Sequence, residues 1–386
     1  MSSLQHPEPI PTWRDRWSGD AEGAVVLDLG EQPASDLFPL PTDAAPDPRY
    51  RMRMVFSPTS GLLQLEQDPT TPEETMGVEP AALVRQADLC VADAISAGLI
   101  RPHSRVLHYP SPHGGSWRPQ LEPFELDEVT EGKADLIVDV HGMMHAADQK
   151  AGFLERLGHL AEDGVMLFMI HNASAIVREG MWNALKNGHF AYYTTPALVR
   201  MADEIGLVAI GAWSYSLYNH GTTMLAFAKK GGSRGDTQAA SVTALIAEET
   251  ALGVLDPDRL VTSLHTSLVE SVAAIREYLD QAAANGLTVA GYGAASRTAA
   301  LLSSASITSD DVTMIADASA AKHGRAMPGS RIPIVSPGDL VAAKPARVLL
   351  FISDLLPEVR AAMPGVEENG GRWVVVDPIP TEIDPS

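Results

Sequence analysis

Residues 134–170 contain the pattern that decides the fold class: ADLIVDV at 134–140, GFLERLGHLAE at 152–162 and GVMLFMI at 164–170. The first and third segments are short apolar runs, which are typical of buried strands. The middle segment repeats its apolar residues at helical spacing. A strand, a helix and a second strand in this order predict a parallel sheet, because parallel strands need a long crossover that is usually a helix.

The same alternation continues on both sides of this unit. RVLHY at 105–109 precedes it as another strand, and a helix at 197–205 follows it, with two further strands at 207–218 and 222–230. The polar stretch KKGGSRGD at 229–236 is rich in glycine, and stretches of this kind are natural domain boundaries. We therefore expect a first Rossmann-like lobe that ends there.

A second lobe is expected beyond this boundary. After the helix-start signal DPDRL, apolar residues recur at helical spacing on one face, at Leu260, Leu264, Leu268, Val272, Ile275 and Leu279. This spacing predicts a long connecting helix. Strand and helix signals then alternate from LTVAGYGAASRTAALL at 287–302 to RWVVVD at 372–377, which indicates a smaller Rossmann-like lobe.

The N-terminal part predicts a small antiparallel module. Its short strand signals, separated by turns rich in Pro and Asp, are AVVLDL at 24–29, YRMRMVF at 50–56 and GLLQL at 61–65. The expected fold class is therefore α/β with a small β module in front. We predict three domains: the β module at 1–78, an α/β domain at 79–230, and a linker, long helix and Rossmann-like domain at 231–386.

The composition excludes several classes of protein. The formal net charge of −21 repels phosphate backbones, so we expect no nucleic-acid partner. No apolar run approaches the ~18 residues of a membrane span, and the first residues lack a secretion signal, so we expect a cytoplasmic protein with no membrane partner. The single cysteine, Cys90, excludes an internal disulfide and a multi-cysteine zinc site. It falls in a helical stretch at 80–99 and is expected in the core.

The motif GYGAASR at 291–297 stands between a strand and an Ala-rich helix. Glycines let the backbone approach a ligand, and the first N–H groups of a helix can bind an anion. We therefore expect this loop to bind a phosphate-bearing substrate; the alternative is a tight turn without a ligand. The substrate-binding residues predicted from this motif are Gly291, Tyr292, Gly293, Ser296 and Arg297.

Three histidines follow strand or helix ends at the expected carboxyl edge of the first sheet: His171, His189 and His220. Open α/β sheets place their ligand sites at this edge, and a neutral imidazole can act as a general base. The alternative for each is a hydrogen-bonded structural imidazole. We interpret no histidine spacing in the chain as a metal site.

The segment between the first two predicted strands of this lobe is short. VLHYPSPHGGSW at 106–117 should form the ligand-binding turn, but its prolines lack N–H donors, and His108 stands where such strands commonly carry a carboxylate. Residues 118–133 then lead directly to the next strand. A nucleoside-binding lobe needs a helix, a strand and a second helix there, which takes roughly 35–45 residues. We therefore expect no pocket for a nucleoside.

Taken in order, these features resemble the deoxysugar C-methyltransferases, enzymes that methylate a nucleotide-linked keto-sugar with S-adenosylmethionine. DASAAKHGRAMPGSRIPIVSP at 317–337 is similar to the family's series of Asp, Lys-Gly, Pro-Gly and Ile-Pro-Ile, and GYGAASRTAALL is similar to its Gly-Tyr-Gly-Ala loop. LGEQPASDLF and SGLLQL resemble its opening module. HFAYYTTPAL at 189–198 resembles its Glu-His-Phe-Ser-Tyr-Phe stretch.

The resemblance implies that the first lobe is a truncated class I methyltransferase-like domain. It also implies site residues. Asp317 and Lys322 join the predicted substrate-binding set, and His189 takes the place of the family's base. Tyr192, in the same stretch, joins His171, His189 and His220 in the predicted catalytic set.

The chain departs from the family at its zinc site. Family members carry two Cys-x-x-Cys pairs there, and the matching positions are Asp15, Ser18, Ser57 and Ser60. Hydroxyl groups are poor zinc ligands. We therefore expect the N-terminal module to fold without a metal.

Two further departures concern the catalytic and cofactor sites. The tyrosine and glutamate that neighbour the family's base correspond to Lys186 and Gly188. The deletion after Trp117 removes the part that the family uses for adenosine and ribose. We therefore expect neither S-adenosylmethionine nor another cofactor.

From these losses we predict an enzyme of specialised metabolism, antibiotic or deoxysugar-type, that works without S-adenosylmethionine. Its expected chemistry is elimination, epimerisation or ring closure on a phosphate-bearing or activated small molecule, as a lyase or cyclase. His189 would be the general base, with His171 or His220 orienting it or stabilising charge. Two alternatives stay open: an S-adenosylmethionine-dependent C-methyltransferase of a nucleotide sugar, with the cofactor held by SPHGGSW, and a non-catalytic partner subunit of another biosynthetic enzyme.

Overall fold

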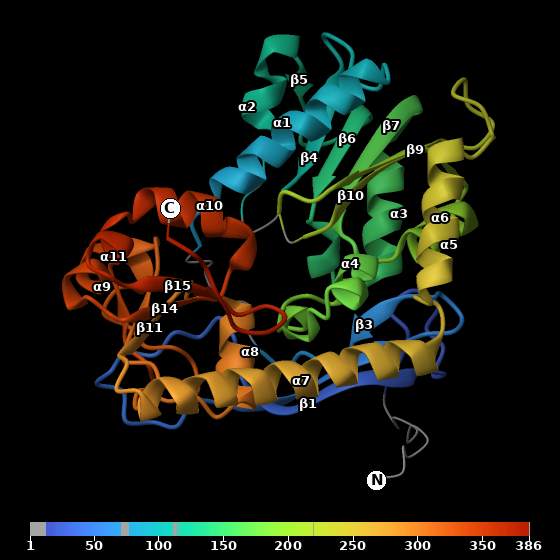
Figure 1. Ribbon diagram of the computed structural model, residues 1–386. Helices are drawn as coiled ribbons and strands as arrows, with labels where there is room; N and C mark the ends of the chain where they lie inside the picture. The colour runs from blue at the N-terminus through green and yellow to red at the C-terminus, as the bar shows by residue number, and fades with distance from the viewer. Residues whose placement is uncertain (1–12, 71–76, 111–113, 115, 219, 386) are drawn as a thin grey trace.

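The computed structural model describes residues 13–70, 77–110, 114, 116–218 and 220–385. These residues form three β-sheets with helices packed around them (Figure 1). Within these ranges, no helix is both long and apolar enough to cross a lipid bilayer. The predicted α/β class, with two Rossmann-like lobes and a small β module, is confirmed by this architecture.

The first six-stranded sheet contains the strands that the alternating pattern predicted. Its order is β5 (Asp127–Glu128), β4 (Arg105–Tyr109), β6 (Ala134–Val140), β7 (Leu160–His171), β10 (Thr222–Lys229) and β9 (Leu207–Tyr215). The strands from β5 to β7 pair in parallel, whereas β10 is antiparallel to both of its neighbours. β7 begins at Leu160, earlier than the start at residue 164 that the sequence predicted.

Helices cover both faces of this sheet. They are α3 (Gln149–His159), α5 (Thr195–Glu204) and α6 (Ala240–Leu252) on one face and α1 (Ala81–Ser96) on the other. Phe168 of β7 packs with the first group, and its neighbour Met169 packs with α1. Successive side chains of a strand point to opposite faces of the sheet, so β7 is buried on both sides. Cys90 lies buried on α1, as predicted, and burial raises the pKa of its thiol to about 12.

The connection between β4 and β6 is as short as the sequence suggested. It contains α2 (Arg118–Leu121), the 3-10 turn η1 (Glu122–Phe124) and the two residues of β5. The described part of this connection holds no helix–strand–helix unit. β5 pairs with Arg105 and Val106, at the beginning of β4. This edge of the sheet is therefore reduced to one very short strand.

The four-stranded sheet is antiparallel and includes a strand that the sequence did not predict. Its order is β1 (Ala24–Pro33), β2 (Arg49–Phe56), β3 (Leu63–Leu65) and β8 (Ala191–Tyr192). β8 comes from the middle of the chain, and its Tyr192 pairs with Leu63. The domain boundary at residue 78 stays a prediction, because this sheet combines segments from both sides of it.

The four positions that correspond to the family's zinc ligands lie together beside this sheet. Asp15 accepts hydrogen bonds from Ser18 Oγ at 3.0 Å and Ser57 Oγ at 2.5 Å. Ser57 Oγ in turn accepts one from the backbone N–H of Ser60 at 3.3 Å. Asp15 also accepts one from Gln64 Nε2 at 3.2 Å. A buried carboxylate and its donors therefore occupy these four positions.

The second six-stranded sheet lies in the C-terminal part of the chain, as predicted. Its order is β13 (Ile334–Val335), β12 (Ile315–Ala316), β11 (Val289–Tyr292), β14 (Arg347–Leu350), β15 (Arg372–Val375) and β16 (Thr381–Glu382). β16 is antiparallel to β15, and the other pairs are parallel. Its helices are α8 (Ser296–Ser304), α9 (Pro337–Ala343), α10 (Leu356–Ala362) and α11 (Gly365–Glu368).

The helix α7 (Pro257–Ala284) is the long connecting helix that the apolar spacing predicted. Its N-cap is Asp256, whose side chain accepts hydrogen bonds from the N–H groups of Asp258 and Arg259. Its buried face includes Leu260, Leu264, Ile275 and Leu279 and packs in one core with β1 and β2. Figure 1 shows α7 passing beneath both six-stranded sheets, so this helix connects the two halves of the molecule.

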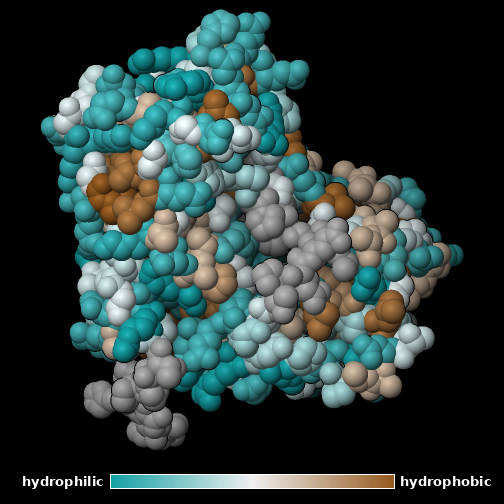
Figure 2. Space-filling view, turned by 180° about the vertical axis from the view of Figure 1, so that it is seen from behind, coloured by the Kyte–Doolittle hydropathy of each residue, from teal (hydrophilic) through white to brown (hydrophobic). Residues whose placement is uncertain are grey.

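The surface is mostly polar on the face opposite to that of Figure 1. Figure 2 shows apolar residues there as separate groups among hydrophilic ones. This distribution agrees with the formal net charge of −21. Outside the grey atoms, no extended apolar surface is visible on this face.

Candidate functional site

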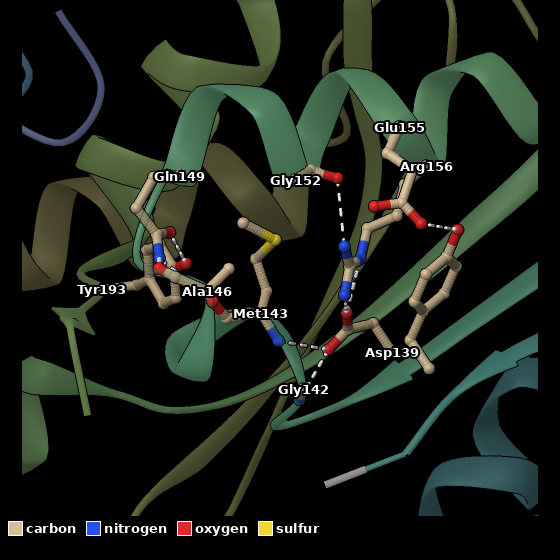
Figure 3. Close-up of polar contacts among 10 residues, drawn as sticks. Asp139, Gly142, Met143, Ala146, Gln149, Gly152, Glu155, Arg156 and Tyr193 are labelled. Carbon is tan, nitrogen blue, oxygen red and sulfur yellow. Dashed lines mark hydrogen bonds and ion pairs between the residues drawn. The ribbon is translucent and has the colours of Figure 1, made fainter. Parts of the chain in front are cut away.

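The carboxyl end of β6 is fixed by a buried ion pair (Figure 3). Arg156 of α3 donates from Nε to Asp139 Oδ2 at 2.7 Å, and the two side chains are 7% and 1% exposed. Asp139 Oδ1 accepts hydrogen bonds from the N–H groups of Gly142 at 2.8 Å and Met143 at 3.0 Å. Burial raises the pKa of Asp139, and the guanidinium and these N–H groups act against that rise. The loop that follows β6 is therefore anchored to α3.

The same loop is held a second time by Gln149 and Tyr193 (Figure 3). Gln149 Nε2 donates to the carbonyl oxygens of Met143 at 3.0 Å and Ala146 at 2.6 Å. The hydroxyl of Tyr193 donates to Gln149 Oε1, and both side chains are buried. The short turn η2 (Met143–His145) lies between these two anchors. His141, two residues before η2, and His145, its last residue, are therefore held in place.

His141 and His171 line a closed pocket at this edge of the sheet, whose side chains leave no space for a water molecule. His171 is the last residue of β7, and His141 directly follows β6 and donates its backbone N–H to Met169 O at 2.9 Å. The other lining residues are Asp139, Met143, Met144, Met169, Ile170 and Tyr193. Two imidazoles therefore meet a largely apolar pocket where β6 and β7 end.

His145 and His189 form a second imidazole pair. Their ring centroids lie 4.7 Å apart and the rings are nearly perpendicular, at 85°. Nδ1 of His145 is 2.8 Å from the carbonyl oxygen of Gly188, so Nδ1 carries the proton and donates it there, and Nε2 is the unprotonated nitrogen. Burial, and then the charge of Lys186, lower the pKa of His145 to about 4. The ring is therefore neutral at pH 7.

Tyr192 lies beside His189 and forms hydrogen bonds with nearby backbone groups. Its ring centroid is 6.2 Å from that of His189. Its hydroxyl accepts a hydrogen bond from the N–H of Lys186 at 3.1 Å and donates one to the carbonyl oxygen of Ala184 at 3.2 Å. Burial raises the pKa of this hydroxyl. The geometry makes Tyr192 a positioning residue for the segment that carries Lys186, and its predicted catalytic role stays a prediction.

His220 has a different environment from the two pairs. It precedes β10 with a φ of 54°, and its Nε2 is 3.1 Å from the hydroxyl of Ser353. Ser353 begins the turn η5 (Ser353–Leu355) of the second six-stranded sheet. The structure therefore brings His171 to the pocket and His189 to His145, but it places His220 in a contact between the two six-stranded sheets.

The GYGAASR loop forms a tight turn between β11 and α8. Gly293 has a φ of +101°, and a Cβ there would lie 3.0 Å from the side chain of Ile352, so this position favours glycine. A Cβ on Gly291 would lie 2.6 Å from the ring of Phe351. Tyr292 is buried against Trp373. Gly291 and Tyr292 therefore pack in the core, and Gly293 makes the turn.

The predicted substrate-binding residues Asp317 and Lys322 contact the glycine loop itself. Asp317 Oδ2 accepts a hydrogen bond from the N–H of Ala294 at 2.8 Å. Lys322 Nζ donates to the carbonyl oxygen of Ala294 at 2.8 Å and lies 3.4 Å from Asp317 Oδ2. These two side chains therefore bind both backbone polar groups of Ala294 and hold the loop in place.

Ser296 and Arg297, at the start of α8, also contact carboxylates. The hydroxyl of Ser296 donates to Asp36 Oδ1 at 2.6 Å. Arg297 pairs with Asp354 at 2.7 Å, and these two side chains are 13% and 2% exposed. A phosphate at this loop would compete with these carboxylates for the same donors. The substrate-binding role of the loop therefore stays a prediction.

The shortened sheet edge carries an acid that has a partner. Glu128 of β5 accepts a hydrogen bond from Arg118 Nε at 2.9 Å. It pairs with Val106, near the beginning of β4 and not at its carboxyl end. The ribose-binding acid of a Rossmann-like lobe lies at the carboxyl end of its strand. Glu128 is the last residue of β5, so it stands at the carboxyl end of its own strand, although its exposed side chain pairs with Arg118.

Sequence reasoning missed His141 and His145. They are the ends of HGMMH, an H-x3-H spacing directly after a predicted parallel strand, and this position was the signal that could have found them. On a regular helix both rings would share one face. Here His141 has a φ of 57° and η2 is a single 3-10 turn, so each ring joins a different pair. In the described part of the chain, no group of three or more His, Cys, Asp or Glu side chains could hold a metal ion.

Sequence comparisons connect this chain to one family. Residues 218–380 match the C-methyltransferase C-terminal domain. The chain is also 28% identical over 225 residues to the C-methyltransferase NovU of Streptomyces niveus. That alignment covers 58% of this chain and 52% of NovU, so the chain spans about half the length of this relative. The resemblance predicted from the sequence is confirmed.

Similar solved structures include two methyltransferases. The 1,6-didemethyltoxoflavin-N1-methyltransferase of Burkholderia thailandensis is 13% identical, with 44% of this chain and 96% of that chain covered and a TM-score of 0.28. The magnesium protoporphyrin IX methyltransferase of Synechocystis PCC 6803 is 10% identical, with 39% and 84% covered and a TM-score of 0.29. At these identities and scores, the likeness concerns the class of fold alone.

The family matches overturn our prediction of an enzyme that works without S-adenosylmethionine. We predicted a lyase or cyclase and no cofactor, whereas both sequence matches are to C-methyltransferases, the alternative that we had ranked second. The physical error lies in the weight given to the deletion after Trp117. That deletion shortens one edge of the sheet, but the parallel strands β4, β6 and β7 and their carboxyl ends remain. A shorter edge therefore does not by itself remove the place at which such sheets bind ligands.

Proposed function

We propose that this chain, a member of the C-methyltransferase family, transfers a methyl group from S-adenosylmethionine to a carbon atom of a small molecule. The observation that carries the proposal is the match of residues 218–380 to a C-methyltransferase domain. That region includes the GYGAASR loop and the second six-stranded sheet. The first six-stranded sheet adds the parallel strand ends at which Rossmann-like lobes bind nucleosides.

The pocket at the ends of β6 and β7 is closed in this structure, so its side chains would have to move apart to admit part of the methyl donor. Met143, Met144 and Ile170 would then face an adenine ring or a methionine chain, and His141 and His171 can form hydrogen bonds. The rest of the donor would extend toward the end of β4. When bound, the donor would supply an electrophilic methyl group.

The ion pair of Glu128 lowers the expected affinity for the donor. Glu128 is the carboxylate at the carboxyl end of β5, and it is paired with Arg118 in an exposed ion pair. Breaking a pair of this kind to bind the ribose hydroxyls costs up to about 1 kcal/mol. This cost corresponds to a dissociation constant up to about 5-fold weaker.

The imidazole pair of His145 and His189 supports chemistry at a carbon acid. A carbon next to a carbonyl group becomes nucleophilic when it loses a proton. His145 is neutral, and its Nδ1–H is fixed on Gly188 O, so it can hold its neighbour in one orientation. We assign His189 the role of general base and His145 that of a positioning residue. The acceptor class that the family resemblance implies is a nucleotide-linked keto-sugar.

The proposed reaction needs a small-molecule acceptor and no second protein. The acceptor would lie near His189, in the segment that also carries Lys186, whose polar contacts continue to Ser296 and Asp36. No observation on the described residues calls for a second protein. A partner subunit is therefore not part of the proposal.

The test is a methyl-transfer assay with the purified full chain. S-adenosylmethionine with a ¹³C-labelled methyl group is incubated with a thymidine-diphosphate-linked 4-keto-6-deoxyhexose, and the product is analysed by NMR for a new carbon-bound methyl group. Binding of S-adenosylhomocysteine is measured separately by calorimetry. We expect both measurements to be positive.

The variant His141→Ala tests whether S-adenosylhomocysteine binds at the pocket between β6 and β7. We expect it to weaken S-adenosylhomocysteine binding about 10-fold, since one lost hydrogen bond costs about 1–1.5 kcal/mol. His159→Ala is the matched control, because His159 lies at the opposite end of the sheet, where Nδ1 contacts Gly132 O. A folded wild-type chain that neither binds S-adenosylhomocysteine nor methylates the sugar would contradict the proposal.

A further inference from the structure

Lys186 lies between η3 and β8 and links this segment to the start of α8. Its Nζ donates to the hydroxyl of Ser296, at the start of α8, at 3.3 Å. That hydroxyl donates to Asp36, which lies between β1 and β2. The backbone N–H of Lys186 donates to the hydroxyl of Tyr192, which fixes this part of the chain. A single ammonium group therefore contacts the second six-stranded sheet from the segment that carries His189.

The surroundings of Lys186 act against its positive charge. Burial is the largest cause that lowers the pKa of this lysine, and the charges of Lys322 and Arg297 lower it further. Asp36 acts in the opposite direction. The net direction is downward, so the ammonium group of Lys186 gives up its proton more readily than that of an exposed lysine. A buried ammonium group that served only as an ion-pair partner would gain nothing from two neighbouring cations.

Lys186 also influences the imidazole pair. Its charge is one of the causes that hold the pKa of His145 low, so the two side chains are close enough to interact. The ring of His145 in turn meets that of His189 edge-on, with the ring centroids 4.7 Å apart. Lys186 and the imidazole pair therefore lie in one neighbourhood. This combination can remove a proton from carbon and stabilise the negative charge that results.

We propose that Lys186 is a further catalytic residue, whose ammonium group donates a hydrogen bond to the carbonyl oxygen of the acceptor while His189 removes the proton from the neighbouring carbon. The electron pair of the C–H bond forms a carbon–carbon double bond, and the π pair of the carbonyl moves onto oxygen. The proton goes to the imidazole of His189, and Lys186 holds the enolate oxygen. This inference rests on the proposed C-methylation.

The first test needs no acceptor. Lys186 is acetylated with limiting acetic anhydride at a series of pH values, and its labelling is followed by mass spectrometry. We expect half-maximal labelling below the value of about 10.4 for an ordinary lysine. In Asp36→Asn it should fall further, because the carboxylate that raises the pKa is gone. Labelling at the ordinary value, or none in the folded chain, would overturn the proposal.

The second test uses methyl transfer. Lys186→Met should lower kcat about 100-fold or more with little change in KM, since a lost oxyanion donor costs about 10²- to 10³-fold. Lys186→Arg should recover part of kcat. Lys133→Met is the matched control, because Lys133 is exposed and donates to the carbonyl oxygen of Gly158. It should behave like the wild type.

The outcomes separate the two proposals. If the wild type methylates the acceptor and Lys186→Met keeps full kcat, Lys186 is a structural residue and this inference fails while the proposed function stands. If Lys186 labels below the ordinary pH but the wild type transfers no methyl group, the proposed function fails and takes the catalytic role with it. The thermal unfolding temperature of each variant shows whether a loss of kcat is a loss of folding.

Discussion

Asp15 should be one of the most sensitive positions for the stability of the N-terminal sheet. Its carboxylate is buried and accepts hydrogen bonds from the N–H of Trp17 at 2.8 Å, Ser57 Oγ at 2.5 Å and Gln64 Nε2 at 3.2 Å. It also accepts one from the partly exposed Ser18. In Asp15→Ala the first three donors would remain in the interior without an acceptor.

The magnitude follows from these three donors. Each buried donor without a partner costs about 1–3 kcal/mol, so simple addition gives about 3–9 kcal/mol. Neighbouring effects are not additive and the site relaxes, so we expect about 3–5 kcal/mol. This loss is a large part of the 5–15 kcal/mol that typically stabilises a domain. Asp15→Asn should lose less, because one oxygen is retained.

Urea unfolding and hydrogen exchange of peptides that cover residues 13–20 and 57–65 measure this loss. Asp20→Ala, in the same loop and exposed, is the control and should change the free energy of unfolding by less than about 0.5 kcal/mol. Dialysis of the wild type against a chelator should leave its unfolding unchanged. A loss below about 1 kcal/mol for Asp15→Ala, or a chelator effect as large as that of the mutation, would refute the reasoning.

The other predictions concern the site. Burial and the charge of Lys186 lower the pKa of His145 from 6.5 to about 4, so the native state binds fewer protons than the unfolded state and stability is lost as the pH falls from 6.5 toward 4. The loss is at most about 3 kcal/mol, and solvent screening reduces it. In His145→Asn the free energy of unfolding, measured by urea titration at several pH values, should depend less on pH. Arg156→Met leaves a buried carboxylate unpaired and should cost about 3–5 kcal/mol, whereas Arg105→Met breaks an exposed pair and should cost less than about 1 kcal/mol, as thermal unfolding would show. Gly293→Ala forces a side chain into a φ of +101° and a 3.0 Å contact, so it should cost about 1–3 kcal/mol; an unchanged unfolding temperature would contradict the assigned turn.

Much of the fold could be predicted because its signals are local. The strands around 134–140 and 164–170, and the helix between them, follow from apolar spacing over a few residues. The helix α7 was predictable for the same reason, since its cap and its apolar face lie in one continuous segment. The strand ends were less certain, because β7 gains its first residues by pairing with β6, which the local pattern does not reveal.

The candidate site was predictable only in part. His171 and His189 were found because each follows the end of a predicted element. His141 and His145 were missed, because the H-x3-H spacing of HGMMH was overlooked, and the sequence does not show that these residues end a loop that the sheet anchors twice. The interpretation of the cofactor was wrong for a related reason. A count of residues after Trp117 shows how much chain is absent, but not which part of the ligand site the remaining strands still form.

The sequence by itself determined the alternation of strands and helices, the tight turn at Gly293, the buried position of Cys90 and the family resemblance, since all of these depend on short stretches of chain. Only the tertiary structure decided which side chains meet. Asp15 reaches Ser57, Tyr192 joins the N-terminal sheet, and Lys186 contacts Ser296 across 110 positions of sequence. These contacts exist because separate apolar faces pack together and exclude water, and the same exclusion of water sets the pKa values of His145 and Lys186.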